Sequence, residues 1–353
     1  MDRRQFLIGG AGGLAAPALI APRASARTRT FIADMHFHLL FFGPNPASSR
    51  SLARDMAAGN VTLGSWSLVG DIPWLGRSQR GFVQKGTPRS PEAVSWFQAE
   101  LGRIKSYLAG QNLKIVRTAA DVDLALAGDP HVVLSVEGAT FADNDLSQLA
   151  AAWDAGIRHI QLVHYVRNTI GDFQTERPEH GGLTEFGRSV VRECNRLGIL
   201  VDLAHCSSET VTGALAASKV PVIWSHGSVA TGSRTPHWSM PGWQARQLTL
   251  GAARAIARQG GVVGLWGVRA DVGQSLGGYA DRLTEIADLL GEDNAAIGTD
   301  MNGVINPLIS SFADLQRAVD HWDRRNLSET RIRKLAIENY ARVLKGAFAA
   351  RQA

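Results

Sequence analysis

The sequence has few cysteines and, beyond its N-terminus, no long apolar run. Its two cysteines, Cys194 and Cys206, are too few to form a disulfide scaffold for a chain of 353 residues, so we interpret both as small buried side chains. A ligand or nucleophile role for Cys206, which follows His205 directly, is the alternative. After residue 26 no apolar segment reaches the roughly 20 residues of a membrane-spanning helix. Internal repeats and low-complexity tracts are also missing, and a second domain is not required.

A large excess of one charge is missing as well. The net charge is +5 at pH 7, and residues 1–26 contribute three arginines against one aspartate, which leaves +3 for the rest. This small excess gives no reason to expect a nucleic-acid partner. The hydrophobic fraction of 45% and the charged fraction of 20% are ordinary for a globular protein with a large core.

The first 26 residues have the pattern of an export signal. A basic start is followed by an apolar stretch over 6–20 and by the small-residue sequence Ala-Ser-Ala at 24–26. Arg3 and Arg4, followed by Gln-Phe-Leu, resemble a twin-arginine signal, which would direct the folded chain to the twin-arginine export machinery. An ordinary secretory signal that contains two arginines is the alternative. We therefore expect cleavage after residue 26 and a soluble periplasmic protein of residues 27–353.

Short apolar runs alternate with helical patterns along most of the chain. The eight candidate strands are 30–36, 114–118, 132–137, 159–164, 199–205, 220–226, 262–266 and 295–300. Between them lie amphipathic segments such as 184–197, where Thr184 can cap the start and Gly198 can end the helix. This alternation predicts an α/β fold, either a (β/α)8 barrel or a doubly wound parallel sheet.

Two segments interrupt the alternation. Residues 39–91 are rich in Gly, Ser and Trp and follow the first strand, so we expect a rim insertion that forms part of a pocket wall. Residues 311–350 contain two amphipathic helical patterns with no strand after them, and we expect them to pack on the barrel exterior. Residues 27–353 are thus predicted to form one domain.

Histidines and acids recur where the apolar runs end. The six residues are His36, Glu137, His164, His205, His226 and Asp300. Because the carboxyl ends of parallel barrel strands meet at one mouth, these side chains are predicted to form a metal site there. An open sheet gathers its ligands around a single switch point, so six contributing strands favour the closed (β/α)8 barrel.

His36 and His38 form a His-x-His pair that can approach one metal ion from the same side of a strand. Glu137 can bridge two ions through its two oxygens, and imidazole and carboxylate are ordinary zinc ligands. A rim salt bridge for Glu137 and a structural role for the His-x-His pair are the alternatives. Iron, manganese or cobalt would accept the same ligands.

Five stretches of the sequence, in order, resemble the membrane dipeptidase (renal dipeptidase) family of zinc peptidases. They are SVEGA at 135–139, QLVHYVRNTIGD at 161–172, GLTEFGRSVVRECNRLGILVDLAHCS at 182–207, PVIWSHGSVA at 221–230 and AIGTDMNG at 296–303. The resemblance covers about residues 31–345. It implies a binuclear zinc barrel that cleaves dipeptides, with related members that act on β-lactams or D-amino-acid dipeptides. Family members are often homodimers.

The resemblance also implies roles for individual residues. His36 matches a ligand of the first zinc, Glu137 the bridging carboxylate, and His205 and His226 the ligands of the second zinc. His164 matches the histidine that contacts the substrate and its tetrahedral intermediate.

Asp300 matches the acid beside the metals. We therefore expect a metal-bridging hydroxide as the nucleophile, stabilisation of the oxyanion by zinc and His164, and proton transfer to the leaving amine by Asp300.

Two positions depart from the family pattern. His38 stands where the family usually has aspartate, which removes one negative charge from the site. His237 stands where an arginine usually grips the substrate carboxylate, eleven residues after the second-zinc histidine. Arg234 lies nearby in the sequence and could substitute, although histidine itself offers no bidentate clamp.

These departures keep two alternatives open. One is an amidohydrolase that acts on a non-dipeptide amide, a lactam, a lactone or an N-acyl amino acid. The other, from a different class, is a non-catalytic barrel that binds a metal or a ligand.

Overall fold

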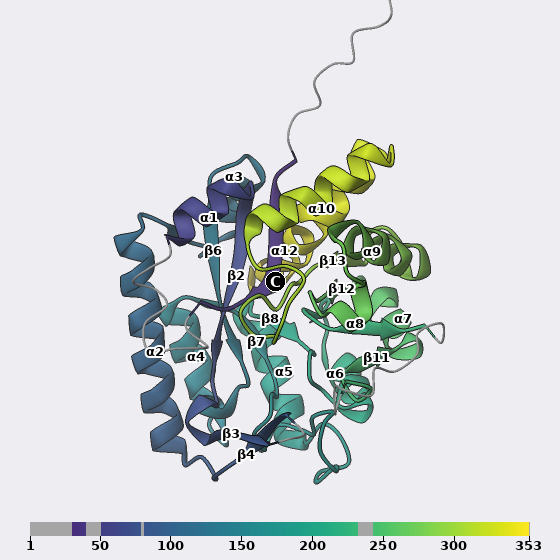
Figure 1. Ribbon diagram of the computed structural model, residues 1–353. Coiled ribbons are helices and arrows are strands. Elements are labelled where there is room, and N and C mark those ends of the chain that lie inside the picture. Colours follow the sequence, from purple (N-terminus) through teal and green to yellow (C-terminus); the bar gives the residue numbers. More distant parts are fainter. Residues whose placement is uncertain (1–29, 40–50, 79–80, 232–242, 353) are drawn as a thin grey trace, which may run out of the picture.

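The computed structural model describes residues 30–39, 51–78, 81–231 and 243–352. It shows a parallel barrel surrounded by helices, so the predicted (β/α)8 fold is confirmed (Figure 1). The barrel strands, in their order around the ring, are β1 (Ile32–Phe37), β2 (Val61–Val69), β6 (His131–Glu137), β7 (Ile157–Gln161), β8 (Leu200–Asp202), β9 (Ile223–Trp224), β12 (Val262–Leu265) and β13 (Ala295–Ile297). The predicted export signal lies outside the described residues.

The ring closes between β1 and the segment after β13. The His38 amide donates to the Met301 carbonyl at 2.9 Å, and the Asp300 amide donates to the His36 carbonyl at 2.9 Å. These bonds tie the first strand to the segment after the last and bring residues more than 260 positions apart in the sequence into contact.

The second barrel strand is β2, not 114–118, so that part of the strand prediction was wrong. β2 lies within the segment 39–91 and pairs with β6 over seven residues. Residues Lys114–Ile115 form only a short strand, β5, that pairs with the start of β6 outside the ring. The sequence of β2, VTLGSWSLV, carries Gly and Ser where Val or Ile is usual, which is why it reads as a loop.

Small residues in β2 are needed because both faces of the strand are closely packed. A Cβ at Gly64 would lie 2.9 Å from the Phe37 ring. The Ser65 hydroxyl donates to the Ser135 hydroxyl at 3.0 Å and lies 3.1 Å from Nδ1 of His159. The strand is buried along its whole length. Its Ser65 hydroxyl is hydrogen-bonded inside the barrel, whereas the Thr62 hydroxyl has no partner among the described residues.

Helices cover the outside of the ring. They are α1 (Leu52–Ala58), α2 (Ser90–Gly110), α3 (Ala119–Leu126), α4 (Ser147–Ala155), α5 (Glu185–Leu197), α6 (Ser208–Ala217), α7 (Leu250–Arg258), α8 (Arg269–Val272) and α9 (Leu276–Leu290), with short 3-10 turns η2 (Ile72–Trp74) and η3 (Thr140–Ala142). The capping prediction for α5 is confirmed, because Thr184 accepts from the Gly187 amide and Gly198 ends the helix with φ +78°. Among the described residues, no helix combines the length and the apolar character needed to cross a bilayer.

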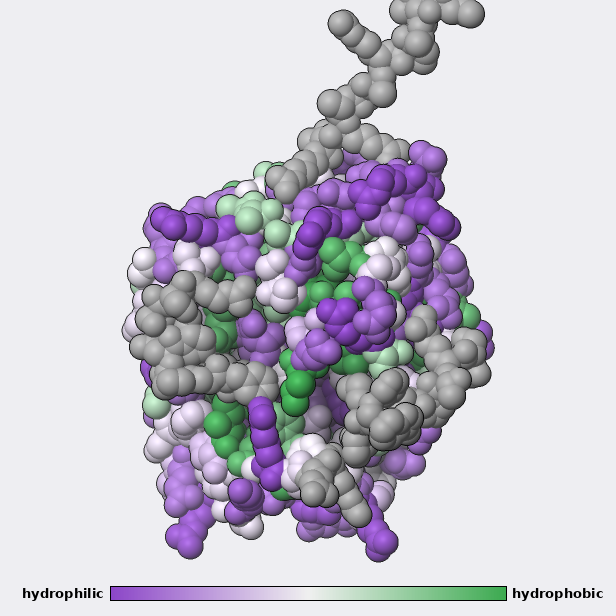
Figure 2. Space-filling view, viewed as in Figure 1, coloured by the Kyte–Doolittle hydropathy of each residue, from purple (hydrophilic) through white to green (hydrophobic). Residues whose placement is uncertain are grey.

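The C-terminal segment forms α10 (Phe312–Arg324) and then a continuous helical run. The run consists of α11 (Glu329–Arg333), the π-helical turn η4 (Lys334–Glu338) and α12 (Asn339–Gln352). Two small sheets lie outside the ring, a hairpin of β3 (Leu75–Ser78) with β4 (Gly81–Gln84) and a parallel pair of β10 (Ser228–Ala230) with β11 (Gln247–Thr249). Figure 2 shows apolar side chains near the middle of the visible face and mostly hydrophilic ones toward its edge.

Candidate metal centre

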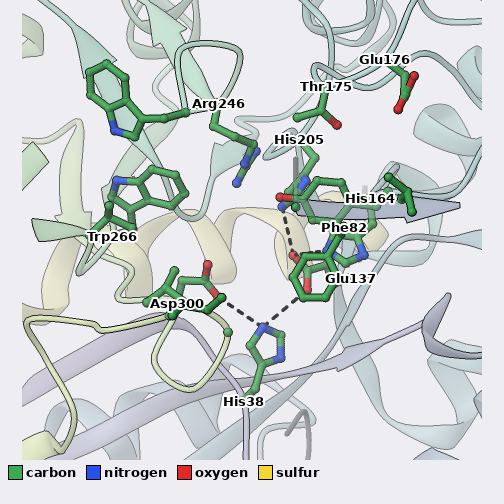
Figure 3. Close-up of a pocket in the computed structure, with 18 residues that line it drawn as sticks. His38, Phe82, Glu137, His164, Thr175, Glu176, His205, Arg246, Trp266 and Asp300 are labelled. Atoms are coloured by element: carbon green, nitrogen blue, oxygen red, sulfur yellow. Dashed lines mark ion pairs between the residues drawn. The ribbon is translucent and has the colours of Figure 1, made fainter. Parts of the chain in front are cut away.

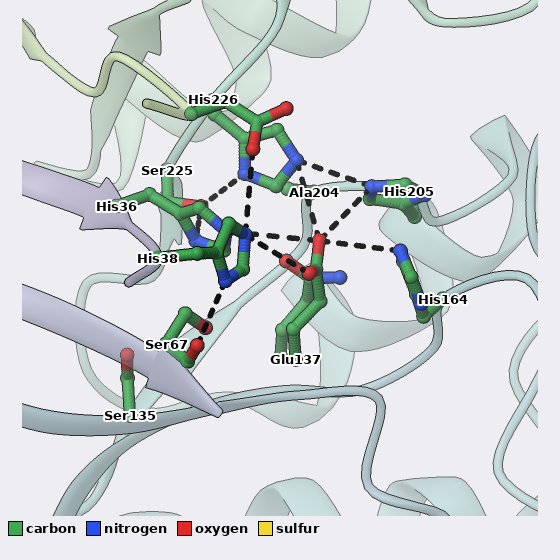
Figure 4. Close-up of polar contacts among 12 residues, drawn as sticks. His36, His38, Ser67, Ser135, Glu137, His164, Ala204, His205, Ser225 and His226 are labelled. Carbon is green, nitrogen blue, oxygen red and sulfur yellow. Dashed lines mark hydrogen bonds and ion pairs between the residues drawn. The ribbon is translucent and has the colours of Figure 1, made fainter. Parts of the chain in front are cut away.

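Seven of the sequence-predicted site residues come together at the carboxyl ends of the barrel strands (Figures 3 and 4; Asp300 is labelled in Figure 3). His36 lies in β1 and Glu137 ends β6, whereas the others follow a strand by one to three residues: His38, His164, His205, His226 and Asp300. The two predicted substrate-binding residues, Arg234 and His237, lie outside the described residues.

Several of these side chains lie beyond the strand ends because the backbone turns there. His205 and Asp300 have φ values of +68° and +54°, in the left-handed region that an extended strand does not use. Such conformations carry local strain in residues other than glycine, and they occur where the fold fixes a side chain for function. Here they direct an imidazole and a carboxylate into the mouth of the barrel.

Glu137 lies at the centre of the cluster and is 2% exposed. Its Oε1 lies 3.2 Å from Nε2 of His205, 3.6 Å from that of His226 and 3.7 Å from that of His36. Its Oε2 lies 3.4 Å from Nε2 of His38. Oε1 thus faces His36, His205 and His226, whereas Oε2 faces His38, so one carboxylate lies among four imidazoles.

The imidazoles form two pairs around this carboxylate. The Nε2 atoms of His36 and His38 lie 3.1 Å apart, and those of His205 and His226 also lie 3.1 Å apart. Three triads bring one ligand atom from each residue within 4.8 Å of the others: His36, His38 and Asp300; His36, Asp202 and His226; Glu137, His164 and His205.

Most imidazoles of the cluster have a hydrogen-bond partner on the outer ring nitrogen, but Nδ1 of His205 has none among the described residues. Nδ1 of His38 lies 2.8 Å from the Ser67 carbonyl, which accepts only from an N–H, so the Nε2 lone pair points inward. Nδ1 of His226 lies 3.0 Å from the Ser225 hydroxyl. Partners on the outer nitrogen orient metal-binding histidines in this way. The described histidines therefore fit divalent cations.

Burial keeps part of the cluster in the protonation state that metal binding needs. Desolvation and the nearby charge of Arg246 hold the pKa of His205 well below its usual value. Desolvation, helped by His36, does the same to the pKa of His226. Burial raises the pKa of Glu137, but His164 and His36 outweigh that effect and leave it well below the ordinary value. Neutral imidazoles beside a carboxylate are the forms that bind zinc.

Asp71 is a site residue that sequence reasoning missed. Its Oδ1 lies 2.8 Å from Nδ1 of His164, and its Oδ2 accepts from the amides of Tyr165 and Val166. Burial opposes protonation of His164, but Asp71 and Glu137 together raise its pKa. Nε2 of His164 consequently faces the cluster, 3.5 Å from Oε1 of Glu137.

Asp34 is a second residue that the sequence did not single out. Its carboxylate is fully buried below the cluster and accepts from the amides of His36 and Thr299 and from the Thr299 hydroxyl. It therefore fixes the backbone on both sides of the barrel seam. The only sequence signal for it was an acid two residues before the His-x-His pair.

A cavity of about 500 Å³ opens above the cluster (Figure 3). His38, Glu137, His164, His205 and Asp300 form its polar end. Its other walls are mainly apolar or aromatic: Phe82, Val83, Tyr165, Trp243, Trp266, Val268, Val304 and Ile305. A site with one polar end and apolar walls is typical of a small-molecule pocket.

Arg246 is the arginine that lines this cavity, and sequence reasoning missed it. It is 4% exposed, its Nη1 donates to Oε1 of Gln174 at 2.8 Å, and its guanidinium lies 5.3 Å from the Trp266 ring centroid. Arg246 directly precedes β11. Because β11 pairs with β10, which begins two residues after His226, this pairing brings Arg246 close to the metal centre. Its Nε has no hydrogen-bond partner among the described residues.

A buried carboxylate fixes the tryptophans of the cavity. Oδ2 of Asp271 accepts from the indole N–H of Trp266 at 2.6 Å and from that of Trp243 at 3.0 Å. Because Trp266 also lies beside Arg246, Asp271 indirectly supports the position of the arginine.

The alternative role for Cys206 has no support, since burial raises the pKa of its thiol well above the ordinary value.

Comparisons with known proteins agree with this geometry. A family model described as membrane dipeptidase (peptidase family M19) matches residues 51–353. Dipeptidase verJ from Clonostachys rogersoniana is 31% identical over 198 residues, which make up 55% of this chain and 49% of that protein. The match thus spans about half the length of this curated relative.

Solved structures show a similar fold. A metallo peptidase from Rhodobacter sphaeroides, liganded with a phosphinate mimic of the dipeptide L-Ala-D-Ala, has a TM-score of 0.75 and 23% identity, with 91% of this chain and 100% of that chain covered. An amidohydrolase from Pseudomonas aeruginosa has a TM-score of 0.71 and 21% identity, with 91% and 97% covered. At these identities the likeness concerns the fold.

Proposed function

The chain belongs to the membrane dipeptidase family, and from this premise we propose that it is a metal-dependent hydrolase that cleaves the amide bond of dipeptides. The observation that carries the proposal is the placement of Arg246 in the same cavity as the imidazole and carboxylate cluster. A dipeptide has a scissile amide and a free carboxylate a few bonds apart. In this cavity the imidazole and carboxylate cluster can act on the amide, and Arg246 can bind the carboxylate.

The proposed cofactors are two divalent cations, with zinc as the first choice. His36, His38 and Glu137 would hold one ion, and Glu137, His205 and His226 the other. Two such ions would polarise the amide carbonyl and lower the pKa of a bound water to about 7. Their arrangement as a binuclear site is part of the proposal.

The residues around the metals would handle protons and charge. Asp300 faces the cavity with its Oδ1 3.4 Å from Nε2 of His38, so it can take a proton from the attacking water and give it to the leaving amine. His164, oriented by Asp71, can donate from Nε2 to the oxygen that gains negative charge. The low exposure of both side chains excludes water that would weaken these interactions.

The other end of the cavity would select the substrate. The Arg246 guanidinium can bind the free carboxylate through two parallel N–H donors, while the aromatic walls accept apolar side chains. The family resemblance places such an arginine at position 237, with Arg234 as a substitute, and Arg246 would supply one from a different position. Arg234 and His237 remain predictions for substrate contact.

A substrate panel on a preparation of known metal content tests the proposal. It compares L,L- and L,D-dipeptides with the matching dipeptide amides, N-acyl amino acids, lactams and lactones. We expect two metal ions per chain and a strong preference for free dipeptides. A preference for compounds without a terminal carboxylate would contradict the dipeptidase function, and full metal content without hydrolysis would indicate a binding protein.

We also propose export through the twin-arginine pathway and a periplasmic location, on the basis of residues 1–26. Replacement of Arg3 and Arg4 by lysine should retain the protein in the cytoplasmic fraction. A homodimer is a further proposal, which the molar mass in solution would test.

A further inference from the structure

A second cavity lies at the opposite end of strand β7 from the metal centre. Its volume is about 760 Å³, and it lies between the start of α3, the end of α4 and the last turns of α12. Four cationic side chains line it: Arg117, Arg158, Lys345 and Arg351. Among the described residues that line it, none is acidic.

Arg158 is the most rigid of these cations. It is 5% exposed, its Nε donates to the Arg117 carbonyl at 3.0 Å, and its Nη1 donates to the carbonyls of Trp153 and Ile157. Its guanidinium lies 3.4 Å from the ring centroid of Trp153. These bonds also cap the end of α4, but within the described part of the chain nothing accepts from Nη2.

Two further guanidiniums lie close to Arg158. That of Arg351 is 4.4 Å from the same Trp153 ring, and that of Arg117 donates to the Asp154 carbonyl at 3.2 Å. Desolvation, followed by the repulsion of Arg117 and Arg351, lowers the pKa of Arg158 to about 10, so it remains charged at neutral pH. The like charges of these three guanidiniums repel one another, so their proximity costs electrostatic free energy.

The nearby acids do not neutralise this group. Asp123 pairs with Lys345 at 2.5 Å. Asp121 accepts from the amides of Arg117 and Thr118 and thereby caps α3. Within the described ranges, no carboxylate forms an ion pair with Arg117, Arg158 or Arg351. The cavity therefore presents three guanidiniums without an anionic partner.

We propose that this cavity binds a small molecule with a phosphate group, with the phosphate against Arg158 and Arg351 and the organic part against Trp153 and Phe348. Planar guanidiniums match phosphate oxygens with parallel donors, and a dianion offsets the repulsion among the arginines. The volume exceeds that of an inorganic phosphate ion, which leaves room for an organic group. Binding here joins α12 to α3 and α4 and stabilises the fold.

The test uses metal-loaded full-length protein, with inorganic phosphate and phenyl phosphate as probes. Calorimetric titrations and unfolding temperatures are measured at constant ionic strength, with sodium chloride as the reference salt. We expect saturable binding of both probes, tighter for phenyl phosphate, and an increase in Tm that sodium chloride does not reproduce. Arg351→Gln should weaken binding about tenfold, which corresponds to the loss of one charge-assisted interaction. Arg254→Gln on α7 removes the same charge elsewhere and is the matched control.

Phosphate can also bind divalent metals, so hydrolysis is followed in the same titrations. Binding at the basic cavity should leave the wild-type rate unchanged, and Arg351→Gln should keep full turnover. Equal affinity of wild type and Arg351→Gln, or a Tm increase that sodium chloride reproduces, would overturn the proposal. Binding to phosphatidylglycerol vesicles without binding of either soluble probe would also overturn it, in favour of a lipid headgroup.

Discussion

Arg246→Met should abolish the proposed preference for a substrate with a free carboxylate over the matching amide. Arg246 is 4% exposed and carries the charge that faces the apolar end of the cavity. Methionine keeps much of the side-chain length beside Trp266 and removes the donors. The substitution therefore isolates the charge from the packing.

The expected magnitude follows from two lost hydrogen bonds. A hydrogen bond to a charged group contributes about 1.5–3 kcal/mol, so two of them contribute at least about 3 kcal/mol. This corresponds to a decrease of roughly 100-fold in kcat/KM for the free dipeptide. The dipeptide amide, which lacks the negative charge, should lose less than about threefold.

The assay is a double-mutant cycle between enzyme and substrate, with wild type and Arg246→Met each measured on a dipeptide and on its amide. Metal content is determined for both proteins, because Arg246 also lowers the pKa of His205 and its loss could change metal binding. Equal losses on the two substrates at unchanged metal content would refute carboxylate binding by Arg246. The arginine would then act through the metal centre.

Three further predictions concern the other end of the cavity. Asp300→Asn should retain both metal ions and lose about 10²–10⁴-fold in kcat. Glu137→Ala should lose metal and activity together. Near-wild-type turnover of Asp300→Asn with full metal content would exclude a proton-transfer role for Asp300. Asp71→Asn should keep the metals but lower kcat by about tenfold or more, because His164 loses the carboxylate that orients it and raises its pKa; an unchanged kcat and pH profile would show that Asp71 is only structural. Removal of metal by a chelator should lower Tm and abolish turnover, and added zinc should restore both; an apo protein with the holo Tm would argue against cations between the imidazoles.

The sequence predicted the part of the site that follows from strand periodicity. Parallel strands carry their terminal residues to a common edge, so the positions of His36, Glu137 and His205 follow once the apolar runs are assigned. The same reasoning failed for β2, because Gly64 packs against Phe37 and Ser65 is hydrogen-bonded inside the barrel, so the strand lacks the Val and Ile signal of a buried strand. Its place was given to 114–118, a run with Ile115 and Val116 that pairs only with the start of β6.

Residues that act through loops were not predictable in this way. Asp71 follows β2 directly and contacts His164, which is 93 positions later in the sequence. Asp271 and Arg246 likewise depend on tertiary contacts with Trp266. A local pattern cannot predict these contacts, because the spacing between the partners is set by the path of the whole chain.

In the folded protein, other residues compensate for the two departures from the family pattern. A histidine at position 38 would be a poor replacement for aspartate if its ring could rotate, but the Ser67 carbonyl fixes the ring with Nε2 toward Glu137. The absence of an arginine at position 237 would remove the carboxylate site, but the pairing of β10 with β11 brings Arg246 to the same cavity. Both compensating residues come from segments that lacked readable chemistry in the sequence. The loss of one negative charge at position 38 is therefore compatible with a metal centre, and the proposed binding of a substrate carboxylate rests on Arg246.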